Sequence, residues 1–320
     1  MAANKQCLFC DGELGEIVFK GVRDRLGVSK KEWNFRRCTQ CGSAILDPMP
    51  TLEELLEAYP PIYHVDQVPQ TNWLHRLQHE LETRFFYEPI YRSSVRQVQR
   101  VTGLRTGRML DVGGGTGHKS VFFQYTGFDV TVLDPDERAL KVARERFGLK
   151  TICGLLEEVD LPENSFDLVG FWFVIEHLPE PQKTLKAAYR ILKPNGWIVA
   201  LVPIVDSWQA RLFKTRWLSV REAPRHVGLP TVNGMRRLLE GCGFTFKGWE
   251  SQNIWDIAGY FALSLIPQAT TTVACTQPTV VRFFWRSVGI LATLIGLPFS
   301  WLEALYGYPS AGVFFAQRME

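Results

Sequence analysis

The chain has 320 residues, which is enough for one large α/β domain and a smaller module. Hydrophobic residues make up 46% of it and charged residues 22%, an ordinary balance for a protein that buries a core. The formal net charge of +3 is slight, so bulk electrostatics does not call for a nucleic-acid partner.

Two Cys-x-x-Cys pairs lie near the start and contain four of the seven cysteines. They are Cys7 with Cys10 and Cys38 with Cys41, and 27 residues separate the pairs. This spacing lets each tight turn aim two thiolates at one ion, so the four sulfurs predict a tetrahedral Zn²⁺ site. The zinc is expected to be structural because the protein fills all four positions. The long intervening segment predicts a hairpin with an enlarged loop.

The redox compartment follows from the same cysteines and from the start of the chain. A metal-binding thiol set suits a reducing compartment better than a secreted disulfide framework does. Residues 1–6 are short and polar, without the apolar stretch of a secretory signal. We therefore expect a cytoplasmic protein.

Three helices are predicted between the cysteines and residue 107. The first covers residues 52–59 and begins with a capping box formed by Thr51 and Glu54. The second is amphipathic and covers residues 72–87. The third follows Pro89 and carries arginines one turn apart, at positions 92, 96 and 100. These arginines could bind a phosphate or a membrane surface, but a solvated helix face is the simpler interpretation.

A strand, a glycine-rich turn and a helix follow one another from residue 108 to 123. Residues 109–112 form the apolar strand, and glycines occupy positions 113, 114, 115 and 117. This order brings backbone against a nucleotide-like ligand. The dinucleotide fingerprint Gly-x-Gly-x-x-Gly is excluded, because counting from Gly113 and Gly115 ends at His118.

The arrangement Asp111-x-Gly113-x-Gly115-x-Gly117 resembles motif I of the class I S-adenosylmethionine (SAM) dependent methyltransferases. The resemblance continues to about Gly243, with several motifs in the usual order. It implies a Rossmann-like α/β fold with a seven-stranded sheet, SAM as cofactor and S-adenosylhomocysteine as product. The cofactor-binding residues that it implies are Asp111, Gly113, Gly114, Gly115, Gly117, His118, Asp134, Pro135, Leu155, Leu156 and Phe173.

The next strands carry the rest of the predicted cofactor site. Residues 128–134 form a buried strand that ends in Asp134, whose carboxylate can accept hydrogen bonds from both ribose hydroxyls. Asp136 is the competing acid, but it suits the start of the next helix better. Residues 150–153 form the third strand. Many family members carry an Asp where this chain has Leu155, so the adenine amine must find another partner.

Strand four begins at Phe166 and ends in a segment, residues 171–179, that matches the family. A helix at residues 181–192 and a turn at 193–196 lead to strand five at 197–202. Strands and helices that alternate in this way predict a parallel sheet covered by helices on both faces.

Two histidines are the candidate catalytic residues. A sulfonium methyl is already activated, so the enzyme must align the reacting atoms and exclude water. A general base is needed only if the nucleophile arrives protonated. His177, at the mouth of the site, and His226, after strand five, could be that base, a substrate contact or a structural histidine. Trp208, Phe213 and Trp217 could line an apolar pocket or belong to the core.

The cysteine module also resembles a known arrangement. A zinc-binding head on some bacterial small-molecule and sugar methyltransferases combines Cys-x-x-Cys-Gly with an Asp-Pro-x-Pro turn, here Asp47 to Pro50. Tyr63 and His64 resemble the tyrosine-bearing segment that can cover the cofactor in related enzymes.

The last 70 residues are unusually apolar. No charge lies between Asp256 and Arg282, and residues 287–302 form a second uncharged run. Neither is expected to be a clean transmembrane helix, because prolines interrupt the first and the second is short and contains Pro298. Residues 311–318 are the candidate for the antiparallel last strand of the sheet. The segment before them is then an insertion that packs on the domain or contacts a membrane surface, with Trp285 and Trp301 at the interface.

These features predict five parts of the chain. They are a zinc ribbon at 1–60, a helical bridge or cofactor lid at 61–107, a SAM-binding catalytic domain at 108–250, an apolar helical insertion at 251–310 and a last strand at 311–320. The predicted function is transfer of a methyl group from SAM to an O, N or C nucleophile of a small or amphipathic substrate, such as a glycan, isoprenoid or lipid precursor.

Two alternatives remain open. One is an RNA methyltransferase that uses the zinc ribbon and the arginine-bearing helix, against which the near-neutral charge counts. The other is a non-catalytic SAM-binding scaffold at the membrane. We expect a small-molecule or amphipathic partner, peripheral membrane contact through residues 251–310 and no nucleic acid.

Overall fold

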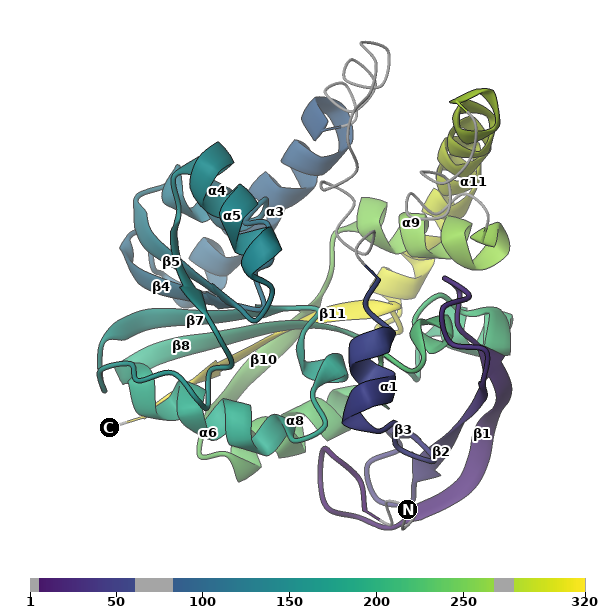
Figure 1. Ribbon diagram of the computed structural model, residues 1–320, viewed down its shortest axis with the longest axis horizontal. Helices are drawn as coiled ribbons and strands as arrows, with labels where there is room; N and C mark the ends of the chain where they lie inside the picture. Colours follow the sequence, from purple (N-terminus) through teal and green to yellow (C-terminus); the bar gives the residue numbers. More distant parts are fainter. Residues whose placement is uncertain (1–5, 61–82, 268–278, 320) are drawn as a thin grey trace.

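The computed structural model describes residues 6–60, 83–267 and 279–319, and its layers are shown in Figure 1. The predicted lid residues Tyr63 and His64 and most of the helix predicted at 72–87 lie outside these ranges. The last five residues of that helix form a short π-helical turn, η3 (Thr83–Tyr87), which leads directly into α3 (Glu88–Thr102).

The larger of two sheets has seven strands in the order β10-β11-β8-β7-β4-β5-β6. The strands from β4 to β8 pair in parallel, and β11 lies antiparallel between β8 and β10. This is the predicted seven-stranded Rossmann-like sheet. Its strands are β4 (Gly107–Val112), β5 (Phe128–Asp134), β6 (Lys150–Cys153), β7 (Phe166–Trp172), β8 (Leu192–Pro203), β10 (Thr245–Ser251) and β11 (Ala311–Gln317).

Helices cover both faces of this sheet and bury a separate apolar core on each (Figure 1). Helices α3, α4 (Ser120–Gln124) and α5 (Glu137–Phe147) pack on one face, where Met109 and Val132 point. Helices α6 (Pro181–Ile191) and α8 (Val232–Gly241) pack on the other, where Leu110 points. The alternation of side chains along each strand thus explains why these strands are apolar at nearly every position.

Strand β8 begins earlier than the sequence indicated. Residues 193–196 were expected to be a turn, but they belong to the strand, which already pairs with Phe166 at Leu192. The pairing shifts before it resumes at Trp197, and Asn195 takes a positive φ of 63°. The predicted turn is therefore a kink inside a longer strand, and the Asn195 N–H donates to the Arg318 carbonyl.

The smaller sheet has the order β1-β2-β3-β9. Strands β1 (Leu14–Arg23) and β2 (Glu32–Cys38) form the predicted hairpin with its long loop, and β3 (Ala44–Leu46) follows. The fourth strand, β9 (Gly228–Leu229), comes from the segment after β8. Trp33 and Phe35 of the hairpin share an apolar core with Trp217 of that same segment. The cysteine module therefore completes its sheet and its core with residues from the middle of the chain.

Short helices connect these parts. Helix α1 (Leu52–Glu57) begins with the predicted capping box, in which Thr51 and Glu54 each accept the other's backbone N–H. After β7 comes the turn η4 (Ile175–His177), and after β8 come α7 (Trp208–Phe213), η5 (Lys214–Arg216) and η6 (Val220–Glu222).

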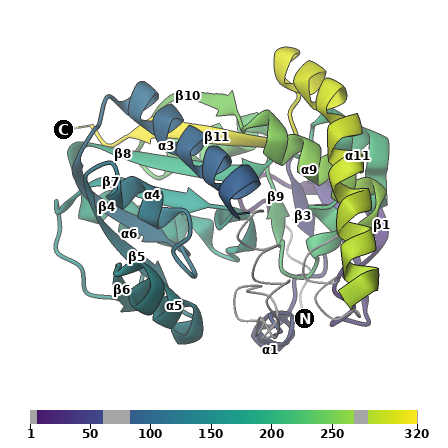
Figure 2. The same ribbon diagram turned by 90° about the horizontal axis from the view of Figure 1, so that it is seen from above.

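Two apolar helices fill the segment between β10 and β11. They are α9 (Ile254–Leu265) and α11 (Thr279–Leu305), which lie side by side at the opposite end of the molecule from α4 in both views (Figures 1 and 2). Helix α11 has 27 residues and runs through Pro298, so it is longer than the uncharged run at 287–302 that was expected to be short. By length and composition alone, Phe284–Leu305 could cross a membrane, and 22% of its most apolar window is buried.

Arg225 joins three distant segments and is completely buried. Its guanidinium donates to Asp24 in the hairpin loop at 2.5 Å, to the Ala58 carbonyl after α1 at 2.9 Å and to Glu222 in η6 at 2.9 Å. Arg25 also pairs with Glu222, so two cations face two carboxylates. Coulombic attraction from Arg25 and Arg225 outweighs the effect of burial and lowers the pKa of Glu222 to about 2.

We expect Arg225→Met to lower the free energy of unfolding by about 3–5 kcal/mol, because it leaves Asp24 buried without its cation. Urea denaturation at neutral pH would measure the change. The matched control is Arg236→Met, which removes an exposed pair with Glu240 and should cost no more than about 0.5 kcal/mol. Equal effects of the two substitutions would contradict this account of Arg225.

Candidate active site

The glycine-rich turn after β4 forms a backbone cradle at the carboxyl end of the sheet. Gly113, Gly115 and Gly117 have positive φ values of 67°, 53° and 76°, which side chains rarely tolerate. A Cβ at Gly113 would lie 2.6 Å from Val174, and one at Gly114 would lie 2.8 Å from the Asp111 carboxylate. The four predicted glycines are therefore required by conformation or by space, and α4 begins directly behind them.

Asp134 at the end of β5 braces this cradle. Its Oδ2 accepts the Gly115 N–H at 2.9 Å, and its Oδ1 accepts the Asp136 N–H at 2.8 Å. Pro135 and Gly154 lie at the same edge of the sheet as this carboxylate. Asp136 caps α5 through the Arg138 N–H, as the sequence indicated.

Asp111 is buried beneath the cradle. The Ser120 hydroxyl donates to its Oδ2, and its Oδ1 has no hydrogen-bond partner among the described residues. Burial raises the pKa of this carboxyl to about 7, while the Ser120 hydrogen bond and the Lys119 charge oppose the rise. The acid of the motif thus supports the loop from below and keeps one oxygen available for a polar ligand.

The remaining predicted cofactor residues occupy different environments. His118 lies 2.8 Å from the Thr116 hydroxyl and packs edge-on against Phe147. Leu155 is 39% exposed at the sheet edge, whereas Leu156 is buried in the apolar core. Phe173 follows β7 with a positive φ of 59° and packs edge-on against Tyr260 of α9.

The two candidate histidines meet. Their ring centroids are 4.6 Å apart, in an edge-to-face arrangement. His177 ends η4 after β7, and His226 is brought to it by the adjacent Val227, whose N–H donates to the Glu176 carbonyl at 2.8 Å. His226 Nδ1 lies 2.8 Å from the Ser219 carbonyl, an acceptor, so this nitrogen carries the proton and Nε2 is free of one in the neutral ring.

Glu176 completes the cluster, and the sequence analysis did not single it out. Its Oε1 lies 3.9 Å from His226 Nε2, and the side chain is fully buried. Burial raises the pKa of Glu176 well above its ordinary value. Burial likewise lowers the pKa of His226 to about 4 and that of His177 well below its usual range. Both shifts favour the neutral form of the ring.

Other residues around this cluster were also missed. The Tyr59 hydroxyl lies 2.8 Å from His177 Nδ1. Tyr260 of α9 is close enough to Glu176 for that carboxyl to help raise the tyrosine pKa, although burial is the larger cause. The sequence alone did not indicate these contacts, because α1 and α9 are far from β7 along the chain.

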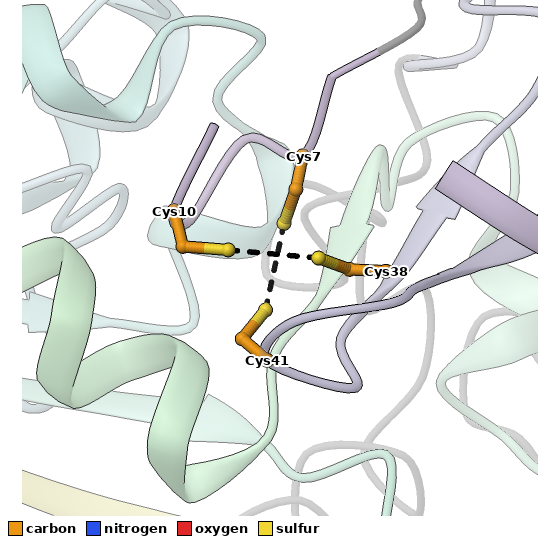
Figure 3. Close-up of side chains that lie close together, drawn as sticks. All are labelled: Cys7, Cys10, Cys38 and Cys41. Atoms are coloured by element: carbon orange, nitrogen blue, oxygen red, sulfur yellow. Dashed lines mark hydrogen bonds between the residues drawn. The ribbon is translucent and has the colours of Figure 1, made fainter. Parts of the chain in front are cut away.

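The four predicted cysteines converge on one point (Figure 3). Cys7 Sγ lies 3.6 Å from Cys41 Sγ, and Cys10 Sγ lies 3.5 Å from Cys38 Sγ. Sulfurs bound to one tetrahedral Zn²⁺ at about 2.3 Å are about 3.8 Å apart, so this arrangement fits the ion. The Thr231 hydroxyl donates to the Cys41 carbonyl at 2.6 Å and thereby fastens the start of α8 to the second knuckle.

The arginines of α3 lie elsewhere. Arg92 pairs with Glu88, and Arg100 pairs with Glu250 of β10 at 2.6 Å. Arg96 and Arg100 line a surface cleft of about 550 Å³ between α3 and the start of α9, and no predicted cofactor or catalytic residue lines it. Among the three aromatic residues after β8, Trp217 is core, whereas Trp208 stacks on Tyr306 and Tyr308 beside α11.

The glycine cradle, the acid at the tip of β5 and the strand order together define a class I SAM-dependent methyltransferase fold. Comparison with known proteins agrees: residues 77–246 match the family model described as a methyltransferase domain. The chain belongs to this family.

Two relatives show the similarity at the level of sequence. A ubiquinone/menaquinone biosynthesis C-methyltransferase from Methylobacterium nodulans is 34% identical over 181 residues, which are 48% of this chain and 72% of that protein. 2-Methyl-6-phytyl-1,4-hydroquinone methyltransferase 2 from Oryza sativa subsp. japonica is 33% identical over 117 residues, which are 35% of this chain and 34% of that protein. The match thus spans only about a third of the plant enzyme.

Solved structures show the same fold. A candidate sarcosine dimethylglycine methyltransferase from Galdieria sulphuraria superposes with a TM-score of 0.50 over 71% of this chain and 85% of that one, at 16% identity.

We expect Asp134→Asn to weaken binding of SAM by about 10- to 100-fold, since losing a hydrogen bond to a charged group costs about 1.5–3 kcal/mol. The new amide N–H₂ would also face the backbone N–H of Gly115 or Asp136. Calorimetric titration with SAM measures the affinity. Asp136→Asn is the matched control, because asparagine also caps helices, and it should change affinity less than about threefold. Similar affinities for both variants would contradict the bracing role of Asp134.

Proposed function

We propose that this protein transfers the methyl group of SAM to a small, amphipathic, quinol- or isoprenoid-type molecule at a membrane surface. The observation that carries the proposal is the glycine cradle braced by Asp134 within a matched methyltransferase domain. The names of the two relatives, which concern a phytyl hydroquinone and ubiquinone/menaquinone biosynthesis, support the substrate class.

The residues of the cradle fit SAM. The positive-φ glycines allow backbone to approach a ligand closely, and a carboxylate at the end of β5, here Asp134, is placed as the acid that accepts hydrogen bonds from ribose hydroxyls in related folds. Asp111 Oδ1, buried and without a described partner, supplies a polar atom beneath the loop. When bound, SAM supplies a methyl carbon that is already activated by the sulfonium, so what remains is alignment and exclusion of water.

We propose that the nucleophilic group of the substrate lies beside Glu176, His177 and His226. A neutral imidazole can accept a proton, and His226 Nε2 is the unprotonated nitrogen that faces the cluster. The Tyr59 hydroxyl fixes the His177 ring through Nδ1. Phe173 packs edge-on against Tyr260 of α9, and the apolar surface of these two rings suits an aromatic or isoprenoid substrate.

Helix α11 supports the proposed membrane contact. Leu291, Leu294 and Ile295, near the middle of the helix, are 59%, 47% and 65% exposed. Trp301, near its carboxyl end, is 52% exposed. So many exposed apolar residues on one helix are unusual for a monomeric surface, and an aromatic residue at its margin is typical of an interfacial helix. The proposed location is therefore cytoplasmic with peripheral attachment to a membrane.

The test is transfer of labelled methyl from SAM to an isoprenoid quinol embedded in phospholipid vesicles. We expect label in the quinol fraction. Ile295→Asp should reduce this transfer by at least about tenfold, because a charged side chain opposes insertion of the helix face. The same variant should leave transfer to a short-chain, water-soluble quinol unchanged.

Tyr125→Asp is the control for this substitution. Tyr125 is also an exposed aromatic residue, but it directly follows α4, which lies away from α11 in both views (Figures 1 and 2), so transfer to vesicles should be retained. Label found in RNA instead would replace the quinol proposal with an RNA substrate. Tight SAM binding without transfer to any fraction would favour a non-catalytic scaffold.

We further propose that the four cysteines hold a structural Zn²⁺. The sulfur separations fit a tetrahedral ion, and four cysteine ligands leave no coordination position open for water or substrate. Both points support a structural role for the zinc rather than a catalytic one. One zinc per chain is expected at this site. Its ligands should be deprotonated, and its loss should loosen β2, β3 and the start of α8 together, because Thr231 is bonded to Cys41.

We expect Cys38→Ser to remove this zinc and to lower Tm by at least about 5 °C. Elemental analysis gives the zinc content, and thermal unfolding gives Tm. Cys153→Ser is the control, since Cys153 is exposed and distant from the cluster, and neither quantity should change. Retention of the full zinc content in Cys38→Ser would refute the four-cysteine site.

A further inference from the structure

The buried carboxyl group of Glu176 has no described hydrogen bond that offsets the free-energy cost of its burial. The side chain has no exposed surface, and neither carboxylate oxygen has a hydrogen-bond partner among the described residues. A buried carboxyl in this state costs several kcal/mol unless something else satisfies it. Buried polar groups are normally paired, so an unpaired pair of oxygens beside two imidazoles indicates a ligand.

The nitrogen of His226 nearest to Glu176 is an acceptor as well. His226 Nδ1 donates to the Ser219 carbonyl, so its Nε2 directs a lone pair toward Glu176. The separation between Nε2 and Oε1 is 3.9 Å, too long for a hydrogen bond. Two acceptors face each other across this gap, and a cation between them satisfies both.

The dimensions suit a metal ion. One ligand atom from each of Glu176, His177 and His226 lies within 4.8 Å of the others. A cation with bonds of about 2.0–2.2 Å holds neighbouring ligands about 3–4 Å apart, so closure needs only small side-chain movements. Both rings are also oriented by other partners: Ser219 fixes His226, and Tyr59 fixes His177. Such outer partners are the usual companions of metal-binding histidines.

Charge around the cluster is compatible with a dication. Glu222 and Asp24 are matched by Arg25 and Arg225, which bond to those carboxylates. Tyr260 faces Glu176 from α9. The donor set offered to the cation is two imidazoles and one carboxylate, because metal ligands bind in their deprotonated form. His177 is only half-buried, which provides a path from solvent.

We propose that Glu176, His177 and His226 bind a first-row divalent cation, a second metal site distinct from the four cysteines. Two imidazoles and a carboxylate suit Zn²⁺, Fe²⁺ or Co²⁺, and three protein ligands leave coordination positions for an oxygen ligand. The histidines then act through the cation rather than as free bases. In the methyl transfer, a role that rests on the proposed function, the ion holds a substrate hydroxyl.

The experiment uses the full chain with its cysteine site saturated with zinc and titrates it with Co²⁺. The expected result is one further Co²⁺ per chain, with ligand-field absorption and without the thiolate charge-transfer bands of a cysteine site. Glu176→Gln should weaken this binding by at least about 100-fold, beyond the effect of losing an outer partner. Tyr59→Phe should weaken it by about tenfold, as a positioning residue.

The control is Glu180→Gln, an exposed carboxylate four residues along the same segment, which should leave Co²⁺ affinity unchanged. His177→Asn is the second variant, because the half-buried position tolerates it if Glu176→Gln fails to fold. Co²⁺ bound only with thiolate bands, or bound equally by Glu176→Gln, would overturn the site. The readout is metal binding, so failure to methylate a quinol leaves the result unaffected.

Discussion

The buried Arg225 guanidinium determines how the active site is assembled. It holds the hairpin loop through Asp24, the end of α1 through the Ala58 carbonyl and η6 through Glu222. Ala58 directly precedes Tyr59, whose hydroxyl contacts His177, and Arg225 directly precedes His226. One side chain thus fixes both the residue before Tyr59, which contacts His177, and the residue before His226. Buried charges of this kind specify a geometry more reliably than they add stability.

The cysteine module is part of the same assembly rather than an appendage. Its sheet is completed by β9, its core is completed by Trp217, and Thr231 is bonded to Cys41. The segment from η6 to α8 therefore lies between two supports, the module on one side and the large sheet on the other. His226 lies within this segment, so the cysteine knuckles, although chemically remote from methyl transfer, restrict the position of a site residue.

Local patterns predicted the large sheet well, because strands β4 to β8 and the helices between them have clear apolar periodicity and the glycine loop has a fixed spacing. Contacts between distant residues could not be read in this way. Ala58 and Arg225 are 167 positions apart, and Tyr59 and His177 are 118 apart. Strand β9 has two residues, too few for any periodic signal. Helix α11 was underestimated because Pro298 indicates a break that packing against α9 overrides.

Glu176 shows the same limit within a recognised motif. It stands beside His177 in the segment that follows β7, yet only the fold reveals that it is buried and that neither oxygen has a hydrogen-bond partner among the described residues. Helix α9 then brings Tyr260 to this carboxyl, while its partner α11 exposes an apolar face. The insertion between β10 and β11 therefore connects the buried cluster to an exposed apolar surface. A substrate with a polar aromatic head and an isoprenoid tail has the same division of polarity, which is the physical argument for the substrate class that we propose.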